Sequence, residues 1–264
     1  LLEMERIMAE QNYVELRHVN KKYKDFQASD DINFGIGKGK LIGLLGPSGS
    51  GKTTILRMLA GLEHADSGEI IIDGRVVNDV PASERGIGFV FQNYALFRYM
   101  TVYDNIAFGL DVKKWKKADI RRRVDELVEL VGLKGFEKRY PNQLSGGQRQ
   151  RAWIAMTLAQ ETEMILLDEP TTYLDMAYQL DVLQLLERMN REKQLTIVMV
   201  LHDLNEACRF ADHIIGLKNG KVVCEGRPAD VITRENIREI YGIDAKLVMS
   251  DGGYPICMEF DRVI

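Results

Sequence analysis

Eight consecutive residues place glycines, a lysine and a threonine at the spacing that holds a polyphosphate. They are Gly46, Pro47, Ser48, Gly49, Ser50, Gly51, Lys52 and Thr53, and Thr54 follows them as a further candidate contact. The segment fits G-x-x-x-x-G-K-[ST], in which glycines let backbone N–H groups turn towards phosphate oxygens. We expect Lys52 to reach the β- and γ-phosphates of a nucleoside triphosphate and Thr53 to help hold Mg²⁺. A chance match is expected about once in a hundred chains of this length, so the pattern predicts a nucleotide site.

The elements on either side of this loop are those that the chemistry needs. Residues 41–45 are short and apolar, which predicts a buried strand, and residues 54–60 have helical character. The N-terminus of such a helix adds partial positive charge beside the phosphates. Strand, loop and helix together favour nucleotide binding over an accidental glycine-rich turn.

Two adjacent carboxylates follow another apolar segment. Residues 164–167 predict a buried strand, and Asp168 and Glu169 come directly after it. Ligands of open α/β sheets bind at the carboxyl ends of the strands. We expect Asp168 to hold Mg²⁺ through water and Glu169 to polarise the attacking water. An Asp-Glu pair after a strand is a weak signal by itself, because acidic residues commonly end strands, but it becomes strong beside the phosphate loop.

A second glycine pair precedes another helical segment. Residues 144–148 read Leu-Ser-Gly-Gly-Gln and lead into residues 149–160. This exposes a further helix N-terminus suited to phosphate. One chain rarely needs two such sites for one nucleotide, whereas two chains that face each other do.

Strand-like and helical segments alternate along the chain, which predicts an α/β fold with a largely parallel sheet. The expected strands are residues 13–19, 40–45, 69–72, 87–91, 164–167 and 196–201. The dipeptides Asp73-Gly74 and Asn219-Gly220 predict tight hairpins, the second between residues 213–217 and 221–224.

The stretch between the expected strand 87–91 and the second glycine pair has a different character. Residues 118–131 carry apolar side chains at helical spacing, which predicts inserted helices rather than further sheet. These side chains are Ile120, Val124, Leu127, Val128 and Val131. The basic run 113–117 is expected to be a solvated helix face rather than an anion site.

Composition limits the class of protein. The chain has 264 residues, 45% of them hydrophobic, a net charge of −4 and three cysteines. It has no apolar run near the roughly 20 residues that cross a bilayer, and its start lacks a signal-peptide pattern. We therefore expect a cytoplasmic protein with reduced thiols and no nucleic-acid partner.

Residues 144–148 match, letter for letter, the signature of the nucleotide-binding subunits of ATP-binding cassette (ABC) transporters, and the chain resembles that family from about Tyr13 to its C-terminus. The resemblance implies a P-loop NTPase fold over residues 12–264. Its parts would be a RecA-like core with an antiparallel β subdomain (12–92 and 144–225), an inserted helical subdomain (93–143) and a C-terminal tail (226–264). Residues 1–11 would be an N-terminal extension.

The resemblance also implies roles for residues outside the first two motifs. Gln92 matches the glutamine that senses Mg²⁺ and the permease, and His202 matches the histidine that contacts the γ-phosphate. Tyr23 matches the aromatic residue that stacks on adenine, with Phe26 as a competing candidate. Asp175 matches the aspartate that crosses the dimer interface.

From the resemblance we expect a head-to-tail homodimer with two ATP molecules at its interface. The side chains and backbone of Ser145, Gly146, Gly147 and Gln148 would close over ATP held by the partner's phosphate loop. ATP and Mg²⁺ would be the cofactors, with Glu169, His202, Gln92 and Lys52 serving hydrolysis to ADP and phosphate. An integral-membrane permease would dock at the Gln92 loop and the helical subdomain, which places the subunit at the inner face of the cell membrane.

The two halves of the sequence resemble different importers. Up to about Tyr140 the chain is similar to sulfate- and sugar-type importer ATPases, and from about Arg151 it is similar to ferric-siderophore importer ATPases. We hypothesise a chimera, natural or engineered, joined within residues 144–151; the alternative is one lineage that drifted. The ending at Ile264, without the regulatory domain usual in the sulfate and sugar type, suits the siderophore type. The cargo is left open.

Two other functions compete with transport. One is a stand-alone cassette ATPase of DNA repair or translation, and the other is an engineered nucleotide-binding protein without a permease. Proteins of the first kind usually carry a long coiled-coil insertion or a second cassette, and neither is found in this sequence. The segment 201–207, Leu-His-Asp-Leu-Asn-Glu-Ala, also resembles importers.

Overall fold

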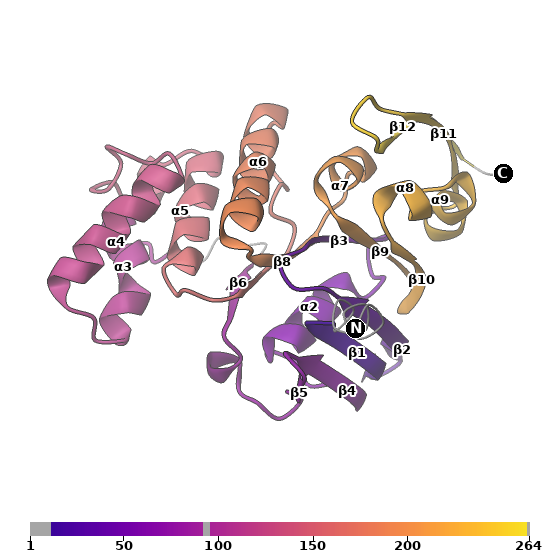
Figure 1. Ribbon diagram of the computed structural model, residues 1–264, viewed down its shortest axis with the longest axis horizontal. Coiled ribbons are helices and arrows are strands. Elements are labelled where there is room, and N and C mark those ends of the chain that lie inside the picture. The colour runs from indigo at the N-terminus through magenta and orange to yellow at the C-terminus, as the bar shows by residue number, and fades with distance from the viewer. Residues whose placement is uncertain (1–11, 92–95, 263–264) are drawn as a thin grey trace, which may run out of the picture.

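The computed structural model describes residues 12–91 and 96–262. Its central sheet has six strands in the order β10-β9-β3-β8-β7-β6 (Figure 1). Their bounds are β3 Leu41–Leu45, β6 Ile87–Val90, β7 Met164–Leu167, β8 Thr196–Val200, β9 His213–Lys218 and β10 Lys221–Gly226. From β9 to β6 the pairing is parallel, whereas β10 is antiparallel to β9. The predicted α/β fold with a largely parallel sheet is confirmed.

A second sheet contains four antiparallel strands in the order β2-β1-β4-β5. Their bounds are β1 Val14–Tyr23, β2 Phe26–Ile36, β4 Ser67–Ile72 and β5 Arg75–Val76. Asp73 and Gly74 turn between β4 and β5 with φ of 49° and 72°, and Asn219 and Gly220 turn between β9 and β10 with φ of 49° and 76°. Positive φ at both turn residues is the conformation of a tight hairpin, so both predicted hairpins are confirmed.

The helices cover the central sheet and extend beyond one of its ends (Figure 1). They are α2 Lys52–Ala60, α3 Val102–Val112, α4 Lys117–Leu130, α5 Gly146–Leu158, α6 Met176–Lys193, α7 Leu204–Phe210, α8 Pro228–Val231 and α9 Arg234–Tyr241, with short 3-10 turns at Ala82–Glu84 and Pro141–Gln143. In Figure 1, α3 and α4 lie beside α5, at the end of the molecule away from the C-terminal hairpin. Every one of the five apolar residues predicted to form a helix face within residues 118–131 is buried there, so the predicted helical insertion is confirmed.

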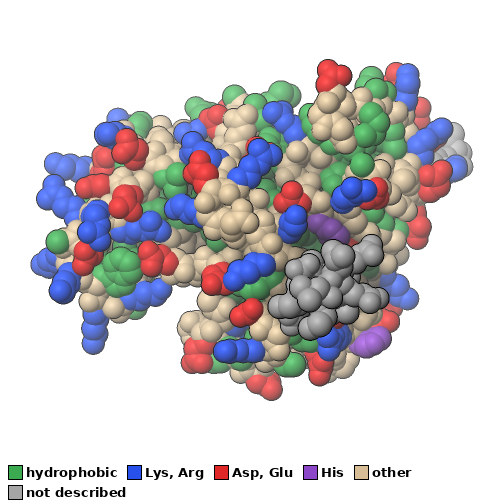
Figure 2. Space-filling model, viewed as in Figure 1, with side chains coloured by type: hydrophobic (Ala, Val, Ile, Leu, Met, Phe, Trp, Pro, Cys, Tyr) green, Lys and Arg blue, Asp and Glu red, His purple; other side chains and the backbone are tan. Residues whose placement is uncertain are grey.

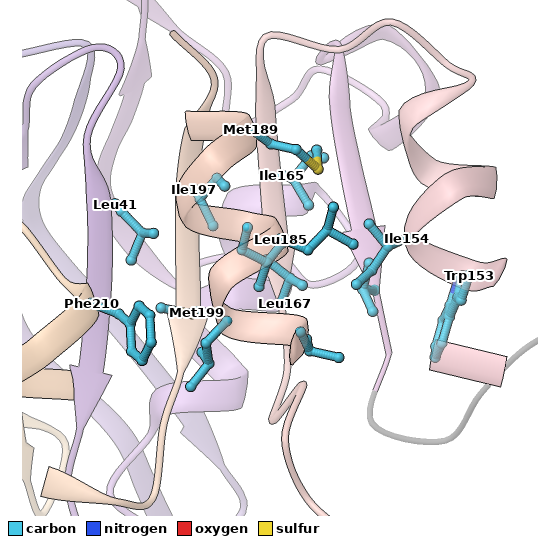
Figure 3. Close-up of a cluster of buried hydrophobic side chains, with 14 of the residues drawn as sticks. Leu41, Trp153, Ile154, Ile165, Leu167, Leu185, Met189, Ile197, Met199 and Phe210 are labelled. Carbon is cyan, nitrogen blue, oxygen red and sulfur yellow. The ribbon is translucent and has the colours of Figure 1, made fainter. Parts of the chain in front are cut away.

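Apolar side chains cover the central sheet on both faces. Leu41, Ile165, Leu167, Ile197 and Met199 belong to a buried cluster with residues of α5, α6 and α7 (Figure 3). The residues that alternate with them, such as those at 42, 166 and 198, join a second cluster with α2 and the antiparallel sheet. Side chains along a strand alternate between its two faces. Because both faces are buried, these strands are uninterrupted apolar runs.

Three strands were not expected from the sequence. The first is β2, in which Asp30 and Asp31 interrupt the apolar pattern. The other two are β11 Ile243–Met249 and β12 Pro255–Arg262, which pair as a C-terminal hairpin within the segment expected to be a tail. Both hairpin strands have many exposed residues, so apolar alternation, the usual signal of a strand, is weak in them.

The surface carries charges of both signs. Figure 2 shows acidic and basic side chains interspersed over the visible face, including the end formed by α3 and α4. Lys113, Lys114, Lys116 and Lys117 are exposed there. The run is solvated as expected, but it does not form a helix face, because residues 113–116 lie in the turn between α3 and α4. Within the two described segments, no helix is long and apolar enough to cross a membrane.

Asn190 ties the end of α6 to the loops that precede β3 and β8. Its buried amide donates hydrogen bonds to the carbonyl oxygens of Gly39, at 2.9 Å, and Leu195, at 2.7 Å.

We predict that Asn190→Ala lowers the free energy of unfolding by about 1–3 kcal/mol, because two carbonyls lose their donor. Urea denaturation measures this. Glu192→Ala, at an exposed position of the same helix, should change it by less than about 0.5 kcal/mol, and equal effects would contradict the prediction.

Candidate functional site

The loop between β3 and α2 requires its glycines. Gly46 has φ of 148°, and a Cβ atom there would lie 2.2 Å from the carbonyl oxygen of Leu217 in β9. Gly51, with φ of 99°, would place a Cβ 2.1 Å from the carbonyl oxygen of Ala28 in β2. Both φ values belong to the region that favours glycine. The loop therefore packs closely against both the central sheet and the antiparallel sheet.

Lys52 is folded into this loop. Its Nζ donates hydrogen bonds to the carbonyl oxygens of Gly46, at 2.7 Å, and Pro47, at 2.8 Å. The side chain is buried, and burial lowers the pKa of Lys52, while the nearby charges of Glu169 and Asp168 act in the opposite direction. The ammonium group is thus held at the centre of the loop, where phosphate oxygens would lie.

Thr53, the residue after Lys52, contacts the side chain of Asp168. The Thr53 hydroxyl donates to Asp168 Oδ1 over 3.0 Å. Asp168 is buried at the carboxyl end of β7, and burial is the main cause that raises its pKa. A hydroxyl and a carboxylate are hard oxygen donors of the kind that Mg²⁺ prefers. The two side chains therefore fit the predicted magnesium site.

Glu169 is held through both of its carboxylate oxygens. His202 Nε2 lies 2.7 Å from Glu169 Oε1, and the Thr172 hydroxyl donates to Oε2 over 3.1 Å. Glu169 itself has φ of 56°, a conformation that non-glycine residues rarely adopt. Such local strain is common at functional sites, and here it accompanies a carboxylate held in a fixed position.

Most of the phosphate loop shares one pocket with Glu169 and His202 at the carboxyl ends of β3, β7 and β8, and Asp168 is bonded to its edge through Thr53. Its lining residues are Phe26, Ser48, Gly49, Ser50, Gly51, Lys52, Thr53, Thr54, Glu169 and His202. The structure thus brings together the phosphate loop, the predicted base and the predicted histidine from three distant parts of the chain. Gln92, predicted to complete the site, lies outside the described residues.

Of the two aromatic candidates for adenine, Phe26 lines the pocket and Tyr23 does not. Tyr23 is hydrogen-bonded to Glu63 and Thr54, and burial followed by the Glu63 contact raises the pKa of its hydroxyl. Its ring centroid lies 5.3 Å from Lys21 Nζ. The two aromatic residues are paired across the β1–β2 hairpin. The hydrogen bond to Thr54 keeps Tyr23 near the phosphate loop, which ends at the preceding residue.

The second glycine pair begins α5. Ser145 caps this helix: its hydroxyl accepts from the backbone N–H of Gln148, whose side-chain oxygen accepts from the backbone N–H of Ser145, at 3.2 and 3.0 Å. A Cβ at Gly147 would lie 2.9 Å from the ring of Tyr178. Asp175 caps α6 in a similar way, by accepting from the backbone N–H of Tyr178. None of the predicted residues 145–148 or Asp175 lines the phosphate-loop pocket.

Two threonines near the base were not singled out in the sequence. Thr172 contacts Glu169, and Thr171 donates to Glu206 of α7 over 3.3 Å. Burial raises the pKa of Glu206, which makes it a second carboxyl group of altered acidity close to the site. The sequence feature that could have identified these threonines is their position, two and three residues after the predicted base.

Comparisons with known proteins agree with this geometry. A model of the ABC transporter family matches residues 29–172. The chain is 51% identical over 211 residues to the sulfate/thiosulfate import ATP-binding protein CysA of Mycobacterium tuberculosis, covering 80% of this chain and 60% of that protein. It is 47% identical over 218 residues to CysA of Synechococcus elongatus, covering 83% and 63%. The chain thus spans about 60% of the length of these relatives.

Two solved structures of ABC proteins are also similar to this chain. The dimeric post-hydrolysis state of the ATP-binding cassette MJ0796 bound to ADP and Pi superimposes with a TM-score of 0.74 at 37% identity, covering 81% of this chain and 98% of that chain. The cbiO1 protein from Clostridium perfringens, part of the ABC transporter complex cbiONQ, gives a TM-score of 0.79 at 29% identity, covering 87% and 94%.

The comparisons give no support to a junction between two importer types. The match to the sulfate importer protein extends over 211 residues, and only 143 residues precede Leu144. That similarity therefore continues well beyond residues 144–151. The siderophore-like character of the second half is likewise not supported.

Replacing Asp168 tests the electrostatic character of the site. Because burial raises the folded-state pKa of this carboxyl above its ordinary value of 3.8, its charge destabilises the free protein above the folded pKa. We predict that Asp168→Asn raises the urea midpoint at pH 7, and that the gain disappears as the pH falls through the folded pKa towards 3.8. The matched control is Asp79→Asn at an exposed position. A lower midpoint for Asp168→Asn at pH 7 would contradict the prediction.

Proposed function

The chain belongs to the ABC transporter family, and from this membership we propose that it is the ATP-hydrolysing, nucleotide-binding subunit of an importer. The observation that carries the proposal is the convergence of the phosphate loop, Asp168, Glu169 and His202 at one edge of the central sheet. The relatives named as import ATP-binding proteins support it.

In the proposed reaction, water attacks the γ-phosphate of ATP and Glu169 accepts its proton. The carboxylate is positioned for this by His202 and Thr172, each of which contacts a different oxygen. Lys52 would leave its carbonyl partners in the loop and bind the β- and γ-phosphates. Mg²⁺, held by Thr53 and Asp168 and proposed to be sensed by Gln92, would supply charge stabilisation for the transferred phosphoryl group.

We propose that the active form is a head-to-tail homodimer. The capped N-terminus of α5 lies outside the pocket of its own chain, and it would offer its N–H groups to ATP in the partner's pocket. Asp175 would contact the partner across the same interface. Tyr173 and Met176, on either side of it in the chain, are each 84% exposed, which fits a surface that becomes buried on assembly. A related cassette of known structure is dimeric.

A membrane-embedded partner is proposed to dock beside the helical insertion. A hollow there is lined by Leu96, Arg98, Tyr99, Tyr140, Pro141, Asn142, Gln143 and Arg149. Tyr99 is 95% exposed, and large exposed aromatic side chains are enriched at protein interfaces. Arg149, which lines the hollow, lies in α5, the helix whose N-terminus is proposed to face ATP of the partner chain. The subunit would then lie at the cytoplasmic face of the membrane.

The same relatives are named for sulfate and thiosulfate import, which supports a proposal for the cargo. We propose an oxyanion cargo rather than an iron chelate for the complete transporter.

A cassette ATPase without a permease has no observation in its favour. Co-purification of the chain with an integral-membrane protein would distinguish transport from both non-transport alternatives. The junction within residues 144–151 stays a prediction that rests on resemblance alone.

Glu169→Gln should abolish steady ATP turnover while ATP still binds. The amide keeps the shape of the side chain but cannot accept the proton of the attacking water. Loss of a general base typically lowers the rate by about 10²–10⁴-fold, which a phosphate-release assay measures. Glu206→Gln is the matched control, because it changes a half-buried carboxyl near the site and should leave turnover close to wild type. Unchanged turnover in Glu169→Gln would exclude this residue as the base.

The Glu169→Gln protein should also dimerise when Mg-ATP is added. Without hydrolysis, ATP remains between the phosphate loop of one chain and residues 145–148 of the other, and its preference for the closed form shifts the equilibrium to dimer. Light scattering after size exclusion, with and without Mg-ATP, measures the mass. A protein that binds ATP and stays monomeric would contradict dimer formation by this chain without its permease.

A further inference from the structure

A lysine occupies a buried position near the end of β1. Lys21 follows the buried Val19 by two positions, and alternate side chains of a strand share one face. Lys21 is itself only 9% exposed. An ammonium group is unfavourable in such a place unless it is paired and hydrogen-bonded. An apolar side chain would therefore be expected here, and the partners of the lysine must explain its presence.

Two carboxylates from the segment between α2 and β4 hold this ammonium group. Lys21 Nζ lies 2.8 Å from Glu63 Oε1 and 3.2 Å from Asp66 Oδ1. Asp66 also binds the backbone of β1. Its Oδ2 accepts from the Lys22 N–H over 2.7 Å, and its own N–H donates to the Asn20 carbonyl oxygen over 2.8 Å. The strand is thus fixed on both sides of Lys21.

The lysine clamp, formed by Lys21, Glu63 and Asp66, connects the β1–β2 hairpin to the helix that begins with Lys52. The Glu63 N–H donates to the carbonyl oxygen of Arg57 in α2 over 3.2 Å, so this side of the clamp belongs to the turn that ends the helix. In Figure 1, β1 and β2 lie beside α2 in the lower part of the view. One helix therefore carries a phosphate contact at its start and a partner of Lys21 just beyond its end.

The tip of the β1–β2 hairpin depends on support from its base, because residues 22–26 are all exposed. Phe26, the last of them, lines the pocket of the phosphate loop. Tyr23 is paired with Phe26 across the hairpin, and its ring centroid lies 5.3 Å from Lys21 Nζ. That distance is within the range of a cation–π contact. The clamp therefore contacts Tyr23 directly, and Tyr23 lies opposite the ring that faces the pocket.

We propose that Lys21 is a positioning residue for the nucleotide base: together with Glu63 and Asp66 it holds Phe26 over the pocket, where the ring stacks on the adenine of ATP. This inference rests on the proposed ATPase function. A group that is held in its bound position before the ligand arrives loses less freedom on binding, which raises affinity. Because the clamp is joined to α2, it sets the ring relative to the phosphate loop. Loss of the clamp should therefore weaken ATP binding and leave the reaction at the γ-phosphate unchanged.

Calorimetric titration of the whole chain with Mg-ATP tests this role. Lys21→Met keeps the apolar stem and removes the charge, and it should raise the Kd about 5- to 30-fold, as expected when a base loses part of its aromatic contact. The kcat at saturating ATP should stay within about twofold of wild type, and Lys21→Arg should restore most of the affinity. Lys38→Met is the matched control. Lys38 Nζ lies 2.8 Å from Glu163 Oε2 and 5.1 Å from the ring centroid of Tyr13, at the opposite end of β3 from the pocket, so its loss should not change the Kd.

A double-mutant cycle separates positioning from a purely structural role. Phe26→Ala should raise the Kd by itself, and Lys21→Met should add no further rise in that background, because it acts through the same ring. Thermal melts check folding, and Glu63→Gln, a change at the more exposed partner, replaces Lys21→Met in the cycle if that variant does not fold. Asn190→Ala should show that lower stability alone leaves the Kd unchanged.

Three outcomes would overturn the inference: an unchanged Kd in Lys21→Met or Phe26→Ala, an equal rise with and without Phe26, or a kcat that falls as the Kd rises. Failure of the proposed function looks different. A wild-type protein that binds no ATP would refute both. One that binds ATP without hydrolysing it would refute the ATPase function, and the Kd values would still decide the role of Lys21.

Discussion

Parallel pairing of β3, β8 and β7 brings three carboxyl ends to one edge of the central sheet. Leu44 lies in register with Val200, and Leu167 with Met199. The segments that follow these strands, namely the phosphate loop, His202 and the pair Asp168-Glu169, therefore begin at the same level. A slip of one residue would exchange the two faces of a strand, and the apolar layers on both faces oppose such a slip. The register of the core thus determines the geometry of the pocket.

The pocket itself works against stability. Burial lowers the pKa of Lys52 and raises the pKa of Asp168. Burial therefore favours the neutral form of each side chain, which means that their charges are unfavourable in the folded protein. Glu169 adds a backbone conformation that is rarely populated. Local rules are commonly violated at functional sites and compensated elsewhere. Here the compensation comes from the apolar clusters on the two faces of the sheet.

Patterns with fixed local spacing predicted the structure well. The phosphate loop lies between the expected strand and helix, and the strand before Asp168 has the expected bounds, because each depends on neighbours in the sequence. Strand β2 was missed because two aspartates interrupt its pattern, and the position of Phe26 in the pocket depends on how the β1–β2 hairpin lies over a distant loop. The roles of Gln92, Tyr23 and Asp175 stay predictions.

The hydrogen bonds of Lys52 within its own loop have a consequence for selectivity. A ligand that binds the ammonium group must first replace the carbonyl oxygens of Gly46 and Pro47 as its partners, so the affinity of that ligand is a difference between two sets of contacts. A nucleoside or monophosphate offers no oxygen at the β- or γ-position and leaves the lysine where it is. A triphosphate offers several charged oxygens, which make stronger hydrogen bonds than neutral carbonyls do. The carbonyl oxygens of the loop thus compete with the ligand for the ammonium group, and this competition favours a longer phosphate chain.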